Sequence, residues 1–324
     1  MFSKHMDYKK LLDDFLQFKR ASGYKYKTEE TILKAFYHYT TVHSDSKLGL
    51  TKKFMQRWAT LQVKEGRKSL SNRVSVLREF GIYLNNFGYK VHLLTTVRNA
   101  KNKSFIPYVF SQEEIVKIFT VIDNLPLSSR NRYNSNEVYP ILFRLLYGCG
   151  LRISEALHLK IREVNTLTGE LSLNIAKNDT KRVVMMSESL REVCHRYKEE
   201  YLPFKEESTT FFQHKDGSIR SIYRVNGFFK DVLYHCDIPY LGRGKGPYLH
   251  NLRHTFACHS FYQMHKQGID MNVVLPVLST YLGHKSIRTT ERYLKLTLSI
   301  LPELRESIGA IASSIYREVE FEKE

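Results

Sequence analysis

The feature of this sequence that most limits its fold is a polar interruption at residues 99–110, which separates two regions of helical patterning. The stretch is charged and contains a proline, a composition typical of a linker. Directly after it, Ser111 and Glu114 have the spacing of a capping box, which predicts that a new helix begins there. A chain of 324 residues is long enough for two domains. We therefore predict one domain at residues 1–103 and a second at residues 104–324.

Apolar residues of the first domain recur at the spacing of helices and predict four of them. The apolar stripes include Leu12, Phe36, Phe54 and Leu77. Residues that favour helix ends give the boundaries. We expect the first helix to end at Gly23, Thr28 and Thr51 to cap the second and third, and the fourth to begin at Ser69 or Ser71 and end at Gly88.

Positive charge is concentrated in this first domain. The chain has 50 Lys and Arg against 33 Asp and Glu, a net charge of +17. Residues 1–103 contain 21 basic and 8 acidic residues (net +13), and the rest of the chain contains 29 and 25 (net +4). Such a field attracts polyanions, and counterion release favours DNA as the partner. We predict DNA contacts from the basic residues between the apolar stripes, although a solvated helix face is the ordinary alternative for any one of them: Lys52, Lys53, Arg57, Arg67, Lys68 and Arg73.

The cysteines and the apolar runs bear on where the protein works. The four cysteines, at positions 149, 194, 236 and 258, show no CxxC spacing, so each is expected to be a small buried residue in a reducing compartment. No apolar run approaches the length of about 18 residues that a membrane span needs, and the first residues lack the apolar region of a secretion signal. These features predict a cytoplasmic protein with no membrane segment.

The second domain is predicted to be mostly helical with one small antiparallel sheet. Residues 170–175 and 181–186 are strand-like and flank a polar turn, which is typical of a β-hairpin. The overall fold class is therefore mainly α. Helices are expected at about residues 139–150, 152–164, 187–202, 221–235, 250–267, 272–282, 286–295 and 300–317.

Two basic positions in this domain are suited to phosphate chemistry. Arg152 follows glycines 148 and 150, at a helix junction where Ser154 can cap the next helix. A guanidinium placed there can bind a phosphate through two parallel hydrogen bonds, or can equally bind loop carbonyls. Lys177 lies at the tip of the hairpin, from which a lysine can reach a substrate. A solvated turn is the ordinary alternative, and Lys181 lies on the same hairpin.

Histidines and tyrosines supply the other candidates. His250 and Arg253 are three residues apart on one predicted helix face, with His254 one turn after His250. This favours phosphate binding over zinc binding by the two histidines, because Asn251 stands where the HExxH zinc motif has glutamate. Further along, His284 precedes Tyr293 by nine residues. Either Tyr293 or Tyr281 could be a nucleophile, or simply a packed aromatic residue.

The ordered set of Arg152, a hairpin lysine, HxxR and LGH followed by Tyr293 resembles the tyrosine recombinase family, also called the phage integrase family. The resemblance covers residues 148–294. It implies a four-helix SAM-like core-binding domain before a mostly helical catalytic domain, with no cofactor or metal. It also implies that Glu155 orients Arg152. The implied roles are phosphate clamps for Arg152 and Arg253, the acid for Lys177 and the nucleophile for Tyr293. Of the two active-site histidines, His250 would orient the tyrosine or accept its proton, and His284 would help the arginines to hold the charge on the phosphate.

Some details depart from the family pattern. The hairpin has Ala176-Lys177-Asn178-Asp179 where the family often has GKGxK, and the chain is longer than usual near residues 263–272. The phrase LPVLSTYLGH resembles transposon-type members.

The implied activity is cleavage and rejoining of double-stranded DNA through a 3′-phosphotyrosyl link. Integration, excision or transposition of a mobile element in a bacterial cytoplasm would use it. Four protomers would act together, and the helix expected at residues 300–317 would dock on a neighbouring protomer. The alternatives are a type IB topoisomerase, which uses similar residues, and an inactive DNA-binding regulator.

Overall fold

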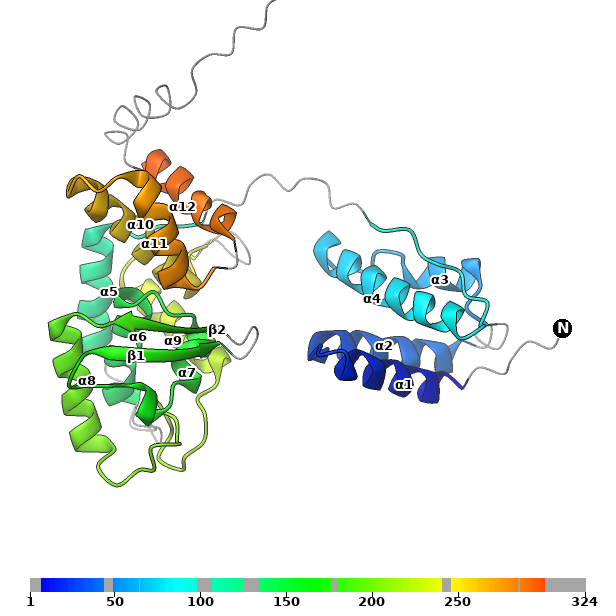
Figure 1. The fold of residues 1–324 in the computed structure, drawn as a ribbon, viewed down its shortest axis with the longest axis horizontal. Coiled ribbons are helices and arrows are strands. Elements are labelled where there is room, and N and C mark those ends of the chain that lie inside the picture. The colour runs from blue at the N-terminus through cyan, green and yellow to red at the C-terminus, as the bar shows by residue number, and fades with distance from the viewer. Residues whose placement is uncertain are drawn as a thin grey trace, which may run out of the picture. The chain divides into compact units, whose positions relative to one another are not determined.

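The computed structural model describes residues 7–43, 49–63, 65–97, 107–124, 135–175, 180–240, 246–284 and 286–300. The contacts between Cα atoms divide the chain into two compact units, residues 1–105 and 106–324. Figure 1 shows the elements of each unit. Within the described ranges, no helix combines the length and the apolar composition needed to cross a bilayer.

The first unit contains the four predicted helices, and three of their predicted ends need comment. Thr51 caps the third helix as predicted, because its Oγ1 accepts a hydrogen bond from the Phe54 N–H at 3.3 Å. Thr28 does not cap the second helix, which begins one residue earlier, after Tyr26 in a left-handed conformation. The fourth helix begins before Ser69. The bounds are α1 Tyr8–Ala21, α2 Lys27–Val42, α3 Lys52–Trp58 and α4 Arg67–Asn86.

Aromatic side chains form much of the core of this unit. Phe15 packs against Phe80 with ring centroids 5.3 Å apart, and Phe36 packs edge-on against Trp58 at 5.3 Å. All four rings are at least 95% buried. Each buried side chain of this size contributes about 1.5–3 kcal/mol through removal of apolar surface from water. The predicted apolar stripes are therefore the faces that hold the four helices together.

The second unit is helical with a two-stranded antiparallel sheet, as predicted. The Ser111 N–H donates to Glu114 Oε2 at 2.8 Å and the Glu114 N–H donates to Ser111 Oγ at 3.1 Å, so the predicted capping box is confirmed. Ser154 does not cap its helix, because Arg152 occupies the N-cap position. All residues but the first of the helix predicted at residues 300–317 lie outside the described ranges. The elements are α5 Gln112–Asn124, α6 Ser135–Gly148, α7 Ile153–His158, the 3-10 turn η2 Ile161–Glu163, β1 Glu170–Ile175, β2 Thr180–Met185, α8 Glu188–Tyr201, α9 Ile222–His235, α10 His250–Lys266, α11 Met271–Leu282 and α12 Ile287–Ile300.

The position of α10 brings distant parts of the sequence together. This helix packs against α6, α11 and α12, and Figure 1 shows α10, α11 and α12 gathered at one end of the unit. The strands pair in the register Glu170 with Met185, which places Leu173 opposite Arg182. As a result, residues from the start of α7, from β2, from α10 and from α12 lie in one region of this unit.

Candidate active site

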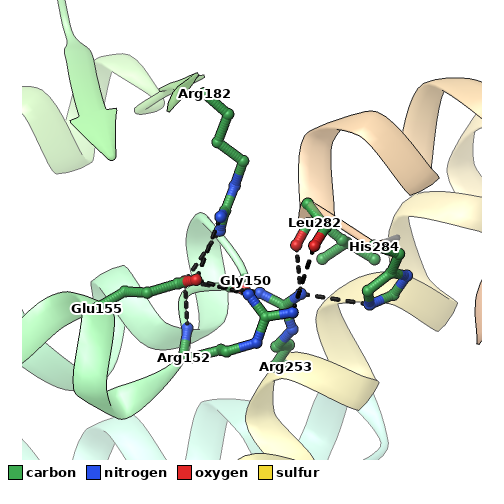
Figure 2. Close-up of polar contacts among 8 residues, drawn as sticks. Gly150, Arg152, Glu155, Arg182, Arg253, Leu282 and His284 are labelled. Carbon is green, nitrogen blue, oxygen red and sulfur yellow. Dashed lines mark hydrogen bonds and ion pairs between the residues drawn. The ribbon is translucent and has the colours of Figure 1, made fainter. Parts of the chain in front are cut away.

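Arg253 is the most deeply buried charged residue of the region, with 1% of its surface exposed. Its Nη1 donates to the Gly150 carbonyl at 2.5 Å, and its Nη2 donates to the Leu282 carbonyl at 2.5 Å. The same Nη2 lies 3.3 Å from His284 Nε2. A buried charge is tolerated only where such hydrogen bonds compensate its desolvation. The orientation of Arg253 is therefore set by carbonyls from two segments far apart in the sequence (Figure 2).

Two glycines shape the backbone that presents these carbonyls. Gly150 has φ +58°, and a Cβ built there would lie 2.4 Å from the ring of Phe256, so neither the conformation nor the space admits a side chain. Gly283 has φ +62° and ends α11 as a left-handed C-cap. Carbonyls that follow a helix end also carry partial negative charge, which favours a cation. The glycines of GCGLR and LGH therefore hold the arginines in place.

Arg152 lies at the junction between α6 and α7, as predicted, and about a third of its side chain is exposed. Its backbone N–H donates to Glu155 Oε2 at 2.9 Å, and its Nη1 donates to Glu155 Oε1 at 2.6 Å. Its Nη2 lies 3.5 Å from the Gly283 carbonyl. The contact with Glu155 is the one that the resemblance implies. It fixes one side of the guanidinium and leaves part of it accessible to solvent.

Arg182 on β2 is a further member of the cluster that the sequence analysis did not single out. Its two Nη atoms lie 3.2 and 2.9 Å from the two oxygens of Glu155. The same carboxylate is 3.9 Å from Arg253 Nη1. Burial alone would raise the pKa of Glu155, but hydrogen bonds from Arg182 and Arg152 outweigh it and lower that pKa to about 2. One ionised carboxylate thus holds three guanidiniums, and the four groups together carry a net charge of +2 (three minus one).

His284 follows α11 and contacts both Arg253 and α12. Its Nδ1 lies 2.9 Å from Thr290 Oγ1, and its ring stacks on Tyr293 with centroids 5.8 Å apart and planes 16° apart. Burial, followed by the positive charges of Arg253 and Arg152, lowers the pKa of His284 to about 4. The ring is therefore neutral at pH 7. Because Arg253 can only donate, His284 Nε2 is the acceptor and Nδ1 carries the proton in this arrangement.

Tyr293 projects from α12 and is 97% buried, in a small cluster with Cys258, Leu282 and Leu296. Burial raises the pKa of its phenol, and the charge of Arg253 acts in the opposite direction. Its alternative, Tyr281, donates its hydroxyl to the Met185 carbonyl at 3.3 Å and stacks on Phe256. Of the two tyrosines, it is Tyr293 that contacts the ring of His284.

The hydroxyl of Tyr293 is hydrogen-bonded to His254 Nδ1 at 3.0 Å, a contact that the sequence analysis did not anticipate. His250, which was expected beside the tyrosine, packs edge-on against His254 with ring centroids 4.7 Å apart. Desolvation and the charges of Arg253 and Arg152 lower the pKa of His250. The sequence signal that could have drawn attention to His254 is its position directly after the arginine of HxxR.

Other predicted positions have different outcomes. Lys177 lies outside the described residues, while Lys181 is exposed on β2. Within the described ranges, no group of three or more His, Cys, Asp or Glu side chains is arranged to hold a metal ion. All four cysteines are buried and free, as expected.

Among the basic residues of the first unit, Arg73 differs from the others. Lys52, Lys53, Arg57, Arg67 and Lys68 are exposed. Arg73 is 93% buried, and it forms an ion pair with Glu65 at 2.8 Å and donates to the carbonyls of Trp58 and Thr60. Its guanidinium therefore holds the segment before α4 and is too deeply buried for the predicted DNA contact.

Comparisons with known proteins identify the class to which this fold and site belong. Over 221 residues, 66% of each chain, the sequence is 30% identical to the tyrosine recombinase XerA of Pyrococcus horikoshii. Over 307 residues, covering 89% of this chain and 94% of the relative, it is 25% identical to the tyrosine recombinase XerD of Listeria innocua. Residues 109–299 match the phage integrase family, and the chain belongs to that family.

Solved structures agree with this fold. The XerH site-specific recombinase, in a post-cleavage complex with its difH substrate, has a TM-score of 0.62 at 20% identity and is matched over 87% of this chain and 78% of its own. A lambda integrase tetramer bound to a Holliday junction has a TM-score of 0.63 at 17% identity, over 90% of this chain and 78% of its own. At these identities the likeness concerns the fold.

Proposed function

We propose that this chain is a site-specific DNA recombinase that cleaves and rejoins DNA through a 3′-phosphotyrosyl bond to Tyr293. The observation that carries the proposal is the convergence of Arg152, Arg253, His284 and Tyr293 within one unit of one chain. Family membership supports the reaction class over a topoisomerase or an inactive regulator. The nucleophile and the phosphate-binding groups would therefore act in cis on the same phosphodiester.

The charge of the site suits a phosphodiester. A DNA phosphate is a monoanion, and additional negative charge gathers on its non-bridging oxygens as the tyrosine attacks. The net charge of +2 on Glu155 and its three arginines matches that increase. A guanidinium has five N–H donors, and Arg253 uses three contacts for the two carbonyls and His284. Donors of Arg253 therefore remain for a phosphate. Arg152, with its accessible side, and Arg253 are proposed to clamp the oxygens.

His284 would add a third donor. To donate from Nε2 it must carry its proton there and accept a hydrogen bond at Nδ1. The hydroxyl of Thr290 can donate as well as accept, so it can serve both tautomers without moving. His250 remains a proposed active-site histidine, and it lies on α10, the helix that also carries Arg253.

The proposed reaction conserves the energy of the phosphodiester. Tyr293 Oη bonds to phosphorus, the bond from phosphorus to the 5′ oxygen breaks, and Lys177 protonates that oxygen. The 5′ hydroxyl of a second strand then attacks the phosphotyrosine and releases Tyr293. Because one bond replaces another in each step, the scheme includes no nucleotide hydrolysis and no cofactor.

The first unit is proposed to bind double-stranded DNA through Lys52, Lys53, Arg57, Arg67 and Lys68. Joining two duplexes requires four cleavages, so we propose a homotetramer on DNA, with residues 300–317 docking on a neighbouring protomer. The lambda integrase tetramer on a Holliday junction supports this arrangement by analogy of fold. We place the reaction in a bacterial cytoplasm, as part of the integration, excision or transposition of a mobile element.

The test uses a duplex from the termini of the element that carries this gene, nicked near the cleavage site so that the released fragment diffuses away. Wild-type protein should accumulate a covalent DNA adduct. Tyr293→Phe should bind the same duplex with equal affinity and form no adduct. Tyr281→Phe is the matched control and should form the adduct. An adduct that persists in Tyr293→Phe would refute the assignment, and joining of two sites rather than relaxation of a one-site plasmid separates recombinase from topoisomerase.

A further inference from the structure

The hydrogen bond between His254 and Tyr293 joins a base to the atom that reacts in the proposed function. His254 Nδ1 lies 3.0 Å from Tyr293 Oη, and the two residues are 9% and 3% exposed. The two rings are 5.4 Å apart, at an angle of 49°. Because this hydrogen bond joins two buried polar groups, His254 is a direct neighbour of the phenolic proton of Tyr293.

The geometry of α10 explains why His254, and not His250, reaches the tyrosine. Consecutive residues on a helix point about 100° apart. Arg253 points to the carbonyls of Gly150 and Leu282, so the next side chain points to α12, which packs against α10. His250 lies one turn earlier and contacts the ring of His254.

The neighbours of the phenol differ in whether they can take its proton. A guanidinium has no acceptor, so Arg253 cannot. The Nε2 of His284 is directed at Arg253. The Nδ1 of His254 faces Oη itself. Burial raises the pKa of the phenol, so at neutral pH Tyr293 is protonated and must lose its proton as it attacks.

We propose that His254 is the general base for Tyr293, an inference that rests on the proposed function. As the bond from Oη to phosphorus forms and the bond to the 5′ oxygen breaks, the phenolic proton moves to His254 Nδ1. A separate acid protonates the 5′ oxygen. In the rejoining step, the bond from phosphorus to Oη breaks and the protonated imidazole returns the proton to Oη.

The first experiment replaces His254 with asparagine and measures the single-turnover rate of adduct formation on the nicked duplex. The asparagine amide occupies the place of Nδ1 and preserves a hydrogen bond to Tyr293, but it does not accept a proton. The rate is expected to fall on the order of 100-fold, as for the loss of a general base. DNA affinity should not change.

The same helix offers a matched control. His259 Nδ1 lies 3.0 Å from the Tyr147 hydroxyl, which is the same contact at the same distance. His259→Asn therefore removes a histidine of the same helix from a tyrosine that takes no part in the proposed reaction. Its cleavage rate should stay within twofold of wild type.

The second experiment separates a base from a merely structural partner. A fluorinated tyrosine introduced only at position 293 has a more acidic phenol and depends less on a base. It should raise the rate of His254→Asn at least tenfold, while leaving the protein with His254 nearly unchanged. The comparison is between the rates of His254→Asn with tyrosine and with fluorinated tyrosine at position 293. Because both proteins carry the same substitution, any loss of folded protein that it causes affects both rates equally and leaves their ratio unchanged.

The outcomes distinguish the two proposals. If His254→Asn cleaves at the wild-type rate, or if the fluorinated tyrosine changes both proteins by the same factor, His254 is not the base. If wild-type protein forms no adduct that depends on Tyr293, the proposed function itself fails.

Discussion

Replacing Glu155 with glutamine removes a negative charge that three guanidiniums share, and the structure gives the size of the effect. The pKa of Glu155 falls from 4.5 to about 2 on folding. At 1.36 kcal/mol per pKa unit, the ionised carboxylate contributes about 3 kcal/mol to the free energy of unfolding at pH 7. The carboxylate is 9% exposed, so solvent screens little of this interaction. Glu155→Gln should therefore destabilise the second unit by about 3 kcal/mol.

The effect should depend on pH in one direction. Because the folded-state pKa lies below the unfolded value, the contribution is complete well above pH 4.5 and is lost as the pH falls toward 2. At pH 3 the same two pKa values leave about 1 kcal/mol. The difference in unfolding free energy between wild type and Glu155→Gln should shrink accordingly, since glutamine resembles the protonated carboxyl.

Urea unfolding at pH 7 and pH 3 measures both quantities, and the chain supplies its own control. Trp58 is the single tryptophan of the sequence and lies in the first unit. Its fluorescence should report the same midpoint in both proteins, while far-UV circular dichroism reports the weakened second unit. A deficit as large at pH 3 as at pH 7, or one that moves the Trp58 transition, would refute the reasoning.

Three further predictions test other parts of the structure. Gly150→Ala should cost about 3 kcal/mol and abolish cleavage, because it combines a left-handed backbone with a Cβ 2.4 Å from Phe256; thermal melting checks this, and Phe256→Ala in the same chain should restore part of the loss. Lys68→Gln should leave stability unchanged and reduce the slope of log affinity against log salt by about 0.9, measured by DNA titration. Arg73→Gln should instead lower the stability of the first unit by about 3 kcal/mol in the Trp58 signal, because it removes the buried guanidinium from Glu65, whose side chain is only 12% exposed; equal stability would contradict its structural role.

Most of the fold was predictable because it depends on local patterns. The apolar stripes predicted the helices. The capping box at Ser111 predicted the start of α5, and the strand-like runs around the hairpin turn predicted β1 and β2 to within a few residues. The predicted start of α2 was wrong, because the helix begins after Tyr26 in a left-handed conformation. The preference of threonine for N-cap positions, on which the prediction rested, does not reveal this conformation. Arg73 and the exposed Lys68 are both basic residues of α4, and the contact of Arg73 with Glu65 appears only in the folded unit.

The candidate site was predictable in its members and not in its contacts. Arg152, Arg253, His284 and Tyr293 come from motifs that can be read along the chain. Which of two histidines four residues apart meets the phenol depends on how α10 packs against α12, a long-range property. The same is true of Arg182, whose strand must pair in one register before its side chain reaches Glu155.

The choice of partners for the arginines follows from what they are proposed to bind. A second carboxylate would hold Arg253 as firmly as the carbonyls of Gly150 and Leu282 do, but it would cancel a charge needed for phosphate. Carbonyls orient a guanidinium by accepting its hydrogen bonds without cancelling its positive charge. The site thus keeps Arg253 aligned while a phosphate oxygen remains its strongest available acceptor. Limiting the cluster to Glu155 leaves it at +2, whereas another acid would leave +1 and no surplus for the charge that develops as Tyr293 attacks.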